Sequence, residues 1–308
     1  MELWQAYHSP QTVAEALELL KSHAGKARII AGGTDLLIDL QHSGNHHMEP
    51  LAALVDVTRI SEMTQITPED DRLLVGGAVT HTAIVKSDLM EERATCLVES
   101  CGVVGGPQVR NVGTLGGNVA HALPAGDGTT SLVALDAEVD VAWGDGRREW
   151  LPLTQIFKGP GQSALDATRD VLVAFRFKLC GQNEATAFKR IMRPQGVALP
   201  ILGCAVWVRL NAAQTHYEDV RISIAPVALV PKRAAEIEAV LRGQPVNDAT
   251  LDQAVAIAYE KIEPRTSKYR ATAEYRSHMI ETLLRRTLPL AIERAKTGVG
   301  KAEGVGLG

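Results

Sequence analysis

The stretch Gly113-Thr114-Leu115-Gly116-Gly117-Asn118-Val119 has a counterpart far upstream in Ala31-Gly32-Gly33-Thr34-Asp35-Leu36-Leu37. Both stretches follow or flank apolar segments and combine small residues with a hydroxyl, and glycine lets a backbone approach a ligand closely. Successive backbone N–H groups in such turns form concavities that bind anions. Each stretch alone is also compatible with an ordinary tight turn. Two of them facing each other, however, could hold a pyrophosphate from both sides.

Neither stretch has the form of the common nucleotide-binding motifs. The strand–GxGxxG–helix pattern of a Rossmann unit is missing, and so is the Lys-Ser/Thr ending of a P-loop. The pair therefore predicts a diphosphate site of a different kind, built from two separate loops.

Composition is that of an ordinary globular protein. The 308 residues are 45% hydrophobic and 22% charged, with a formal net charge of −4, which offers no basic footprint for nucleic acid. No apolar run approaches the roughly 20 residues that span a bilayer. The first residues lack the basic and apolar regions of a secretory signal. We expect a cytoplasmic protein without membrane insertion.

Cysteines and histidines offer little support for a metal site. The cysteines stand at 96, 101, 180 and 204, whereas a structural zinc or iron–sulfur site normally uses four ligands in closer pairs. Buried free thiols are the better interpretation. His42, His46 and His47 share a polar segment without a partner cysteine, which predicts a solvated loop.

The first half of the chain mixes helices and strands. A capped helix is expected after Ser9-Pro10, ending near Gly25, and further helices over 88–103 and 129–135. Strands are expected over 28–31, 51–57, 72–77, 138–142 and 147–150. After residue 151 strand candidates follow in succession at 170–178, 185–192, 202–210 and 220–224, which implies a meander. Helices then cover 234–241, 251–262 and 271–295. The order changes near residue 178, where we place a domain boundary.

Three signatures in this order resemble a known family. They are the first glycine stretch, the stretch Gln108-Val109-Arg110-Asn111-Val112 running into the second, and Pro124-Ala125-Gly126-Asp127. Over residues 3–290 the chain resembles the FAD-binding medium subunit of the molybdenum hydroxylases. This group contains xanthine dehydrogenase, carbon monoxide dehydrogenase and 4-hydroxybenzoyl-CoA reductase.

The resemblance implies an α+β fold with a two-part FAD-binding domain of the vanillyl-alcohol oxidase type. Residues 1–55 would form the first FAD-binding subdomain and 56–178 the second. Residues 179–296 would form a C-terminal domain with a three-stranded antiparallel sheet and a helical bundle. The glycine-rich end, 297–308, has few apolar anchors and is expected to be a flexible tail.

The resemblance also implies the residues that contact a noncovalent FAD. Backbone groups of the first stretch would follow the diphosphate and ribityl chain, and the second stretch would approach from the other side. Val104 stands where some relatives stack an aromatic residue on the adenine. The implied contacts are Ile29, Ile30, Ala31, Gly32, Gly33, Thr34, Asp35, Leu36, Val104, Thr114, Gly116, Gly117, Asn118, Ala120, Asp127, Leu172 and Lys189.

Three of these residues have alternative interpretations. Asp127 matches a family acid that bonds a flavin-side hydroxyl, but an acid before a helix is also a typical N-cap. Leu172 matches a strand that touches the flavin ring, yet it could be plain core. Lys189 matches a lysine near the pyrimidine end of the ring, where positive charge would stabilise the reduced flavin, yet it could be a solvated strand residue.

The family pattern is not followed everywhere. The segment Met192–Pro200 replaces an arginine-rich run that borders the open face of the flavin in many relatives. The identity of the electron acceptor is therefore open. A cysteine-rich insertion that carries a four-iron cluster in some relatives is missing, so no cluster is expected in this chain.

The resemblance implies an oxidoreductase subunit that relays electrons. A small two-iron-two-sulfur subunit and a large molybdopterin subunit would be its partners, in a dimer of heterotrimers, with NAD as one candidate acceptor. No side chain needs to perform covalent catalysis, so no catalytic residue is expected. The alternatives are a stand-alone flavin oxidoreductase of the same fold and a scaffold that has lost FAD. The organic substrate lies outside what this chain determines.

Overall fold

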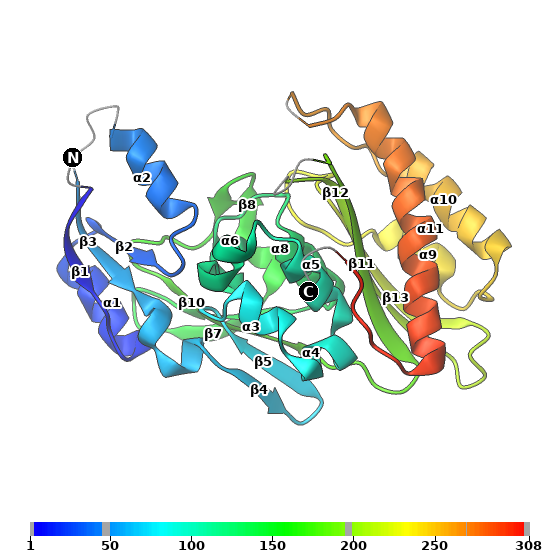
Figure 1. Cartoon of the computed structure of the whole chain (residues 1–308), viewed down its shortest axis with the longest axis horizontal. Helices are drawn as coiled ribbons and strands as arrows, with labels where there is room; N and C mark the ends of the chain where they lie inside the picture. Colours follow the sequence, from blue (N-terminus) through cyan, green and yellow to red (C-terminus); the bar gives the residue numbers. More distant parts are fainter. Residues whose placement is uncertain (1–2, 45–49, 195–198, 269, 305–308) are drawn as a thin grey trace.

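The computed structural model describes residues 3–44, 50–194, 199–268 and 270–304. Three sheet-centred parts follow one another along the long axis of the molecule, from the blue N-terminal part to the orange and red C-terminal helices (Figure 1). The mixed α+β organisation predicted from the sequence is confirmed, including the C-terminal antiparallel sheet. Within the described ranges, none of the helices has the length and apolar character needed to cross a membrane.

The first part is a small parallel sheet in the order β1-β3-β2. Its strands are β1 (Trp4–His8), β2 (Ala27–Ile30) and β3 (Leu51–Asp56). Helix α1 (Val13–Ser22) is capped by the Thr12 hydroxyl and buries one apolar stripe of side chains. Helix α2 (Leu36–Gly44) begins directly after the first glycine stretch. The first glycine stretch therefore lies between the edge strand β2 and helix α2.

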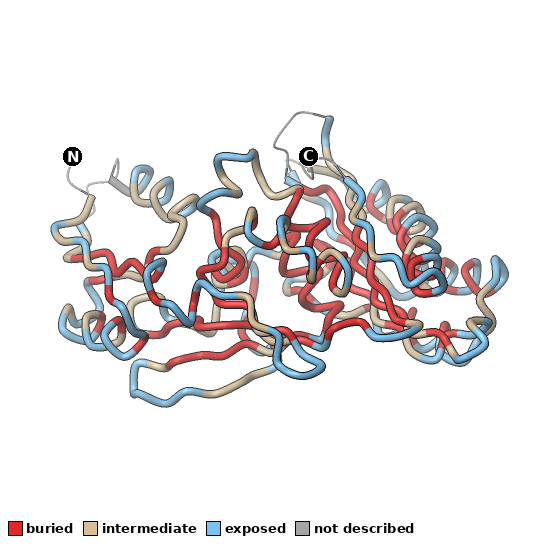
Figure 2. The backbone as a smooth tube through the Cα atoms, turned by 60° about the horizontal axis from the view of Figure 1, so that its bottom comes forward, coloured by how far each residue is buried: buried red, intermediate tan, exposed pale blue. Residues whose placement is uncertain are grey.

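The middle part is a five-stranded antiparallel sheet in the order β4-β5-β10-β6-β7. Its strands are β4 (Ile66–Glu69), β5 (Arg72–Gly76), β6 (Glu138–Ala142), β7 (Arg148–Pro152) and β10 (Val171–Lys178). Strand β10 lies at the centre and is almost wholly buried. Buried residues, red in Figure 2, run through the interior of the molecule, and exposed residues lie at its periphery. The place of β10 here differs from the meander that the sequence suggested for 170–178. A small hairpin, β8 (Phe157–Gly159) with β9 (Gln162–Ser163), forms a separate two-stranded sheet.

Short helices lie in the chain between strands β5 and β6 of this sheet. They are α3 (His81–Val85), α4 (Asp88–Arg93), α5 (Thr95–Gly102), α6 (Pro107–Val112), α7 (Leu115–Ala120) and α8 (Asp127–Ala134). The single helix expected over 88–103 is wrong, because the chain breaks at Ala94, whose φ is −150°. Arg93 exchanges two hydrogen bonds with Cys180 at this point, its Nε donating over 2.8 Å and its carbonyl accepting over 3.0 Å. These long-range bonds favour the break.

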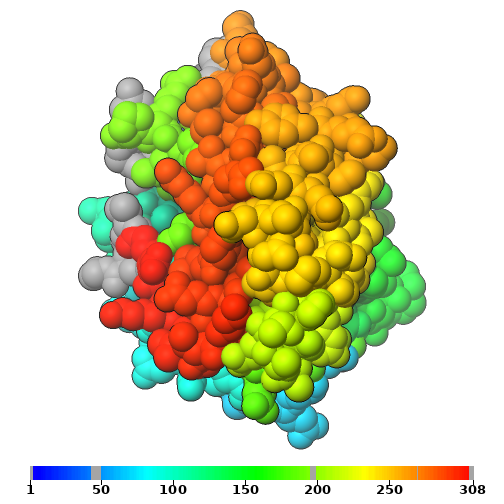
Figure 3. Space-filling model, turned by 90° about the vertical axis from the view of Figure 1, so that its right-hand side faces the viewer, coloured from blue at the N-terminus to red at the C-terminus, as the bar shows by residue number. Residues whose placement is uncertain are grey.

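The C-terminal part is an antiparallel meander of β11 (Glu184–Met192), β12 (Pro200–Leu210) and β13 (Tyr217–Ala225). One face packs on α5 and α8 of the middle part. The other is covered by α9 (Ala235–Leu241) and α11 (Ala273–Thr297), with α10 (Asp248–Lys261) against both helices. Figure 3 looks onto this outer layer, where the orange-to-red α11 lies beside the yellow and orange helices. The sheet is therefore buried on both faces.

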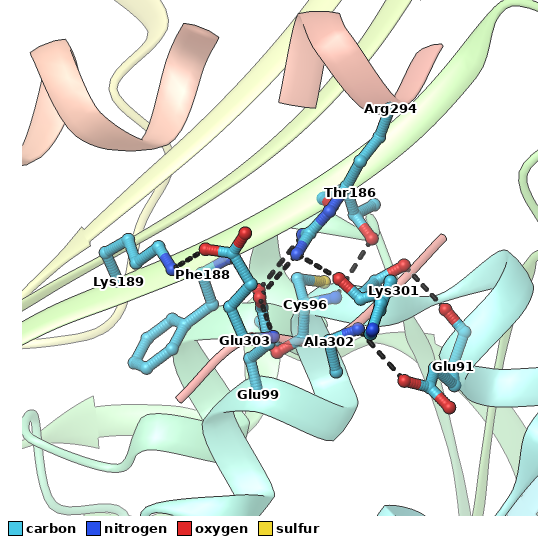
Figure 4. A network of polar contacts seen from close by, with 12 residues as sticks. Glu91, Cys96, Glu99, Thr186, Phe188, Lys189, Arg294, Lys301, Ala302 and Glu303 are labelled. Atoms are coloured by element: carbon cyan, nitrogen blue, oxygen red, sulfur yellow. Dashed lines mark hydrogen bonds and ion pairs between the residues drawn. The ribbon is translucent and has the colours of Figure 1, made fainter. Parts of the chain in front are cut away.

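The chain end returns to the middle part after α11 and forms hydrogen bonds there at residues 301–303. The sequence predicted a flexible tail at 297–308, but the backbone N–H of Ala302 donates to Glu91 and that of Glu303 donates to Glu99. The Arg294 guanidinium donates to the carbonyl of Lys301 (Figure 4). Hydrogen bonds to buried groups thus hold 301–303 in place. Residues 305–308 lie outside the described part.

Glu99 is the centre of this network. Its side chain is 1% exposed and pairs with Arg294, 5% exposed, over 2.7 Å. The carboxylate also accepts the backbone N–H groups of Phe188 at 2.7 Å and Glu303 at 2.9 Å (Figure 4). Helix α5, strand β11, helix α11 and the chain end therefore meet at one buried ion pair.

Candidate functional site

A cleft of about 600 Å³ brings the two glycine stretches together. Its size lies within the range of small-molecule sites, about 300–1,000 Å³. Every predicted contact residue except Lys189 lines it: Ile29, Ile30, Ala31, Gly32, Gly33, Thr34, Asp35, Leu36, Val104, Thr114, Gly116, Gly117, Asn118, Ala120, Asp127 and Leu172. Residues from Ile29 to Leu172 thus meet at one place, as a site built from two separate loops requires.

The first glycine stretch links β2 to α2 by a turn at residues 32–35. Gly33 has φ +68°, a conformation that favours glycine. Among the described residues, no backbone or side-chain oxygen accepts a hydrogen bond from the N–H groups of 32–35. Buried or ligand-facing N–H groups without a partner favour an anionic ligand. The turn therefore has donors available for phosphate oxygens.

The second stretch caps helix α7. The Thr114 hydroxyl accepts the N–H of Gly117 over 3.0 Å, which leaves its own O–H free to donate. Asn118 accepts two hydrogen bonds from Thr129 with its Oδ1, at 3.3 and 3.2 Å. This fixes the amide so that its NH₂ group remains a donor. The side chains of this stretch are thus oriented by the fold before any ligand binds.

The glycines of the two stretches differ in what an added Cβ would contact. A Cβ on Gly32 would collide with the backbone of Val112, and one on Gly116 with the backbone of Gly77. These two positions are needed for close backbone packing. Gly117 is exposed, and a Cβ there would meet only the Thr114 hydroxyl, at 3.2 Å. Gly117 is therefore the position that tests ligand approach and not packing.

A histidine–carboxylate pair connects the two stretches. Nδ1 of His121, at the end of α7, lies 3.4 Å from the Asp35 carboxylate. The hydrogen bond to Asp35 raises the pKa of His121, and the same bond lowers the pKa of Asp35. The imidazole therefore carries its positive charge over a wider pH range than a free histidine. His121 also lines the cleft, next to the predicted phosphate donors.

One end of the cleft is formed by the turn before α6. Val104 lines it together with Gly105, whose φ is +54°, and with Gln108 and Val109. Arg110 stabilises the turn by donating to the carbonyl of Gly105 over 2.9 Å. This wall offers apolar packing and backbone groups, as expected for an adenine bound without aromatic stacking.

Asp127 lies in a buried ion pair. It is the first residue of α8 and makes no capping hydrogen bond there, so the N-cap interpretation is wrong. Its Oδ2 accepts from Nη1 of Arg190 over 2.7 Å. Burial raises the pKa of the Asp127 carboxyl, and the charge of Arg190 counteracts this effect.

Leu172 combines both of its proposed roles. Its side chain is 8% exposed and belongs to the core of the middle part, and the residue also lines the cleft. A Cβ on Gly77 would collide with its carbonyl oxygen at 2.6 Å. Leu172 is thus core residue and cleft wall at once.

Lys189 is the one predicted contact that the structure places elsewhere. Its Nζ lies 2.8 Å from the Glu303 carboxylate (Figure 4). Successive side chains of a strand point to opposite faces, so on β11 Arg190 enters the cleft and Lys189 does not. Arg190 directly follows the predicted contact Lys189 in the sequence, but the sequence alone does not say which of the two faces the cleft.

Other cleft residues had no signal in the sequence. His81 is 2% exposed, and burial lowers its pKa to about 4, so it stays neutral. Arg270 precedes α11 and lies far along the chain from both glycine stretches, which end at residues 37 and 119. Neither residue belongs to a motif. Only the tertiary fold brings them to the cleft.

The cysteines and histidines do not form a metal centre in the described part of the chain. All four cysteines are buried, as predicted, and burial raises the pKa of the Cys96 thiol to about 12. Across the described residues, no group of three His, Cys, Asp or Glu side chains is arranged to hold a metal ion. His42 lies in the last turn of α2, while His46 and His47 lie outside the described residues.

Two family models match the chain. Residues 2–177 match the FAD binding domain in molybdopterin dehydrogenase, and 186–291 match the CO dehydrogenase flavoprotein C-terminal domain. The putative xanthine dehydrogenase FAD-binding subunit of Escherichia coli K12 is 30% identical over 293 residues, covering 94% of this chain and 97% of that protein. The carbon monoxide dehydrogenase medium chain of Hydrogenophaga pseudoflava is 28% identical, with the same coverage.

Solved structures agree with these matches. A carbon monoxide dehydrogenase chain from Hydrogenophaga pseudoflava superposes with a TM-score of 0.86 at 26% identity, covering 96% of this chain and 99% of that chain. A chain of quinoline 2-oxidoreductase from Pseudomonas putida 86 gives 0.83 at 25% identity, covering 94% and 97%. The chain therefore belongs to the family of FAD-binding oxidoreductase subunits of the xanthine and carbon monoxide dehydrogenase type.

Proposed function

We propose that this chain carries electrons between an iron–sulfur subunit and an external acceptor. A small two-iron-two-sulfur subunit would exchange electrons with the FAD held here, and a large molybdopterin subunit would transform the organic substrate. The names of similar proteins support this proposal, because they describe subunits or medium chains of dehydrogenases. An acceptor such as NAD would complete the relay. We also propose a dimer of heterotrimers as the assembly.

The observation that carries the proposal is the convergence of the two glycine stretches on one cleft. The donor set fits FAD: unpaired N–H groups at 32–35, the Thr114 hydroxyl and the Asn118 amide all suit diphosphate and ribose oxygens. His121 adds a positive charge when its imidazole is protonated, which is the sign that a diphosphate attracts. Apolar walls at Val104 and Leu172 suit the two flat ring systems.

The task of the protein in this relay is to hold the cofactor and to set its potential. When bound, FAD supplies a centre that accepts electrons singly or in pairs. The loops fix its diphosphate, and the buried walls exclude water from one side. Leu199, which is 61% exposed, also lines the cleft. We place the approach of electrons or of an acceptor at this residue.

Isolation of the chain from its own cells tests the assembly. We expect a tagged chain to co-purify with one small and one large polypeptide, and the complex to absorb as flavin plus iron–sulfur. Mass photometry should give two copies of each subunit. A tagged chain that purifies alone, with flavin, and turns over a small substrate would contradict the relay and favour the stand-alone oxidoreductase.

A further inference from the structure

The C-terminal part of the chain contributes two arginines to the FAD cleft. Arg190 comes from β11 and Arg270 from the segment between α10 and α11. Besides them, Leu199 is the one further contribution of this part within the described residues. The C-terminal part therefore brings mainly positive charge to a cleft that the first two parts build.

The charge of Arg190 is already compensated. Its Nη1 donates to Asp127 over 2.7 Å, and the two side chains are 8% and 6% exposed. Its Nη2 lies 3.0 Å from the Met192 sulfur. The two opposite charges of this buried pair largely cancel, so the pair adds little net charge to the cleft. It therefore does not by itself favour a negative ligand.

The charge of Arg270 is not compensated in this way. Burial lowers the pKa of its guanidinium, and Asp127 is the carboxylate that counteracts the shift. That carboxylate is already bonded to Arg190, so two cations share one anion. Among the described residues, the guanidinium of Arg270 donates no side-chain hydrogen bond. Arg270 is partly buried and lines the cleft, so a ligand bound there can supply an acceptor for its guanidinium.

The chemistry of FAD indicates which of its groups meets Arg270. The diphosphate has donors at the two glycine stretches, and adenine carries no negative charge. The pyrimidine ring of the flavin has two carbonyl oxygens, and negative charge develops there when the ring is reduced. Electrons also have to reach this ring, and the two arginines line the same cleft as the exposed Leu199.

We infer that Arg270 binds the carbonyl edge of the flavin ring and raises its reduction potential. This inference rests on the proposed function. The Arg190–Asp127 pair would act behind it as a positioning pair, because the Asp127 carboxylate helps to keep Arg270 charged. Charge near the pyrimidine ring is one of the means by which a protein tunes a flavin.

Lys189, the residue before Arg190 on β11, provides a control for the Arg270 variants. It carries the same charge as Arg190 but lies outside the cleft lining, 2.8 Å from Glu303. Its replacement by Met removes one positive charge from the same strand. Any effect of general charge on the potential would appear in this variant as well.

The test is a redox titration of the purified, FAD-containing protein. In Arg270→Met we expect the equilibrium constant for flavin reduction to fall at least tenfold, about 30 mV for a two-electron couple. FAD content should remain near that of the wild type. Arg270→Lys should keep most of the wild-type potential, and Lys189→Met all of it.

Two outcomes would overturn the inference. One is a wild-type potential in Arg270→Met, and the other is an equal loss of potential in Lys189→Met. If Arg270→Met retains too little FAD for a titration, Arg270→Gln decides, because Gln keeps donors and removes the charge. An unchanged potential in Arg270→Gln overturns the inference as well. A wild-type protein that binds no FAD would instead refute the proposed function.

Discussion

A Gly117→Val variant should fold like the wild type and purify without FAD. Gly117 is exposed, lines the cleft, and has only the Thr114 hydroxyl within contact of an added Cβ. The valine side chain would therefore occupy space next to the predicted diphosphate without disturbing the packing. We expect the affinity for FAD to fall at least a hundredfold, ~2.7 kcal/mol. FAD content per chain and thermal unfolding of the FAD-free protein measure the two effects.

Two other glycines serve as controls. Gly181 is exposed and far from the cleft lining, so Gly181→Val should retain FAD. Gly116→Val should destabilise the fold itself, because its Cβ collides with the backbone of Gly77. Full FAD occupancy in Gly117→Val would mean that the second glycine stretch is merely a turn.

Replacement of Arg294 by Met should destabilise the protein by about 3–5 kcal/mol, because it leaves Glu99 as a buried charge without its partner. Glu99 would keep the N–H groups of Phe188 and Glu303 but lose the guanidinium at 2.7 Å. The chain end would also lose the bond from Arg294 to Lys301. Urea unfolding at neutral pH measures the loss of unfolding free energy.

Arg285 provides the matched control on the same helix. It pairs with Asp252 and Glu281 at the surface, where its side chain is 40% exposed. Surface pairs of this kind contribute about 0–1 kcal/mol. Arg285→Met should therefore leave the unfolding midpoint nearly unchanged. An Arg294→Met variant as stable as Arg285→Met would mean that the buried pair does not anchor the C-terminal part.

The local parts of the site could be predicted from the sequence. Glycine, threonine and asparagine mark turns by their own conformational and hydrogen-bonding preferences, so both stretches were recognisable before the fold was known. The order of strands and helices after residue 178 was visible for the same reason. The strand Val171–Lys178 was harder to place, because a central strand buried on both faces looks alike in either sheet.

The long-range parts could not be predicted. The face of β11 that meets the cleft depends on how the sheet packs, so Lys189 and Arg190 could not be told apart by sequence alone. The break at Ala94 depends on Cys180, and the order of the chain end depends on Glu99. The residues joined by these hydrogen bonds lie about 85 to 205 positions apart in the sequence. Local sequence patterns carry no information about such distant partners.

The flavin content of the purified chain tests the account most directly. We predict one FAD per chain, and denaturation should release all of it into solution, because the cleft holds the cofactor by hydrogen bonds and packing. The released flavin is quantified by its absorption and identified as FAD by chromatography. A chain that contains no FAD and binds none when it is added would contradict the central claim, and flavin that stays on the precipitated polypeptide would contradict noncovalent binding.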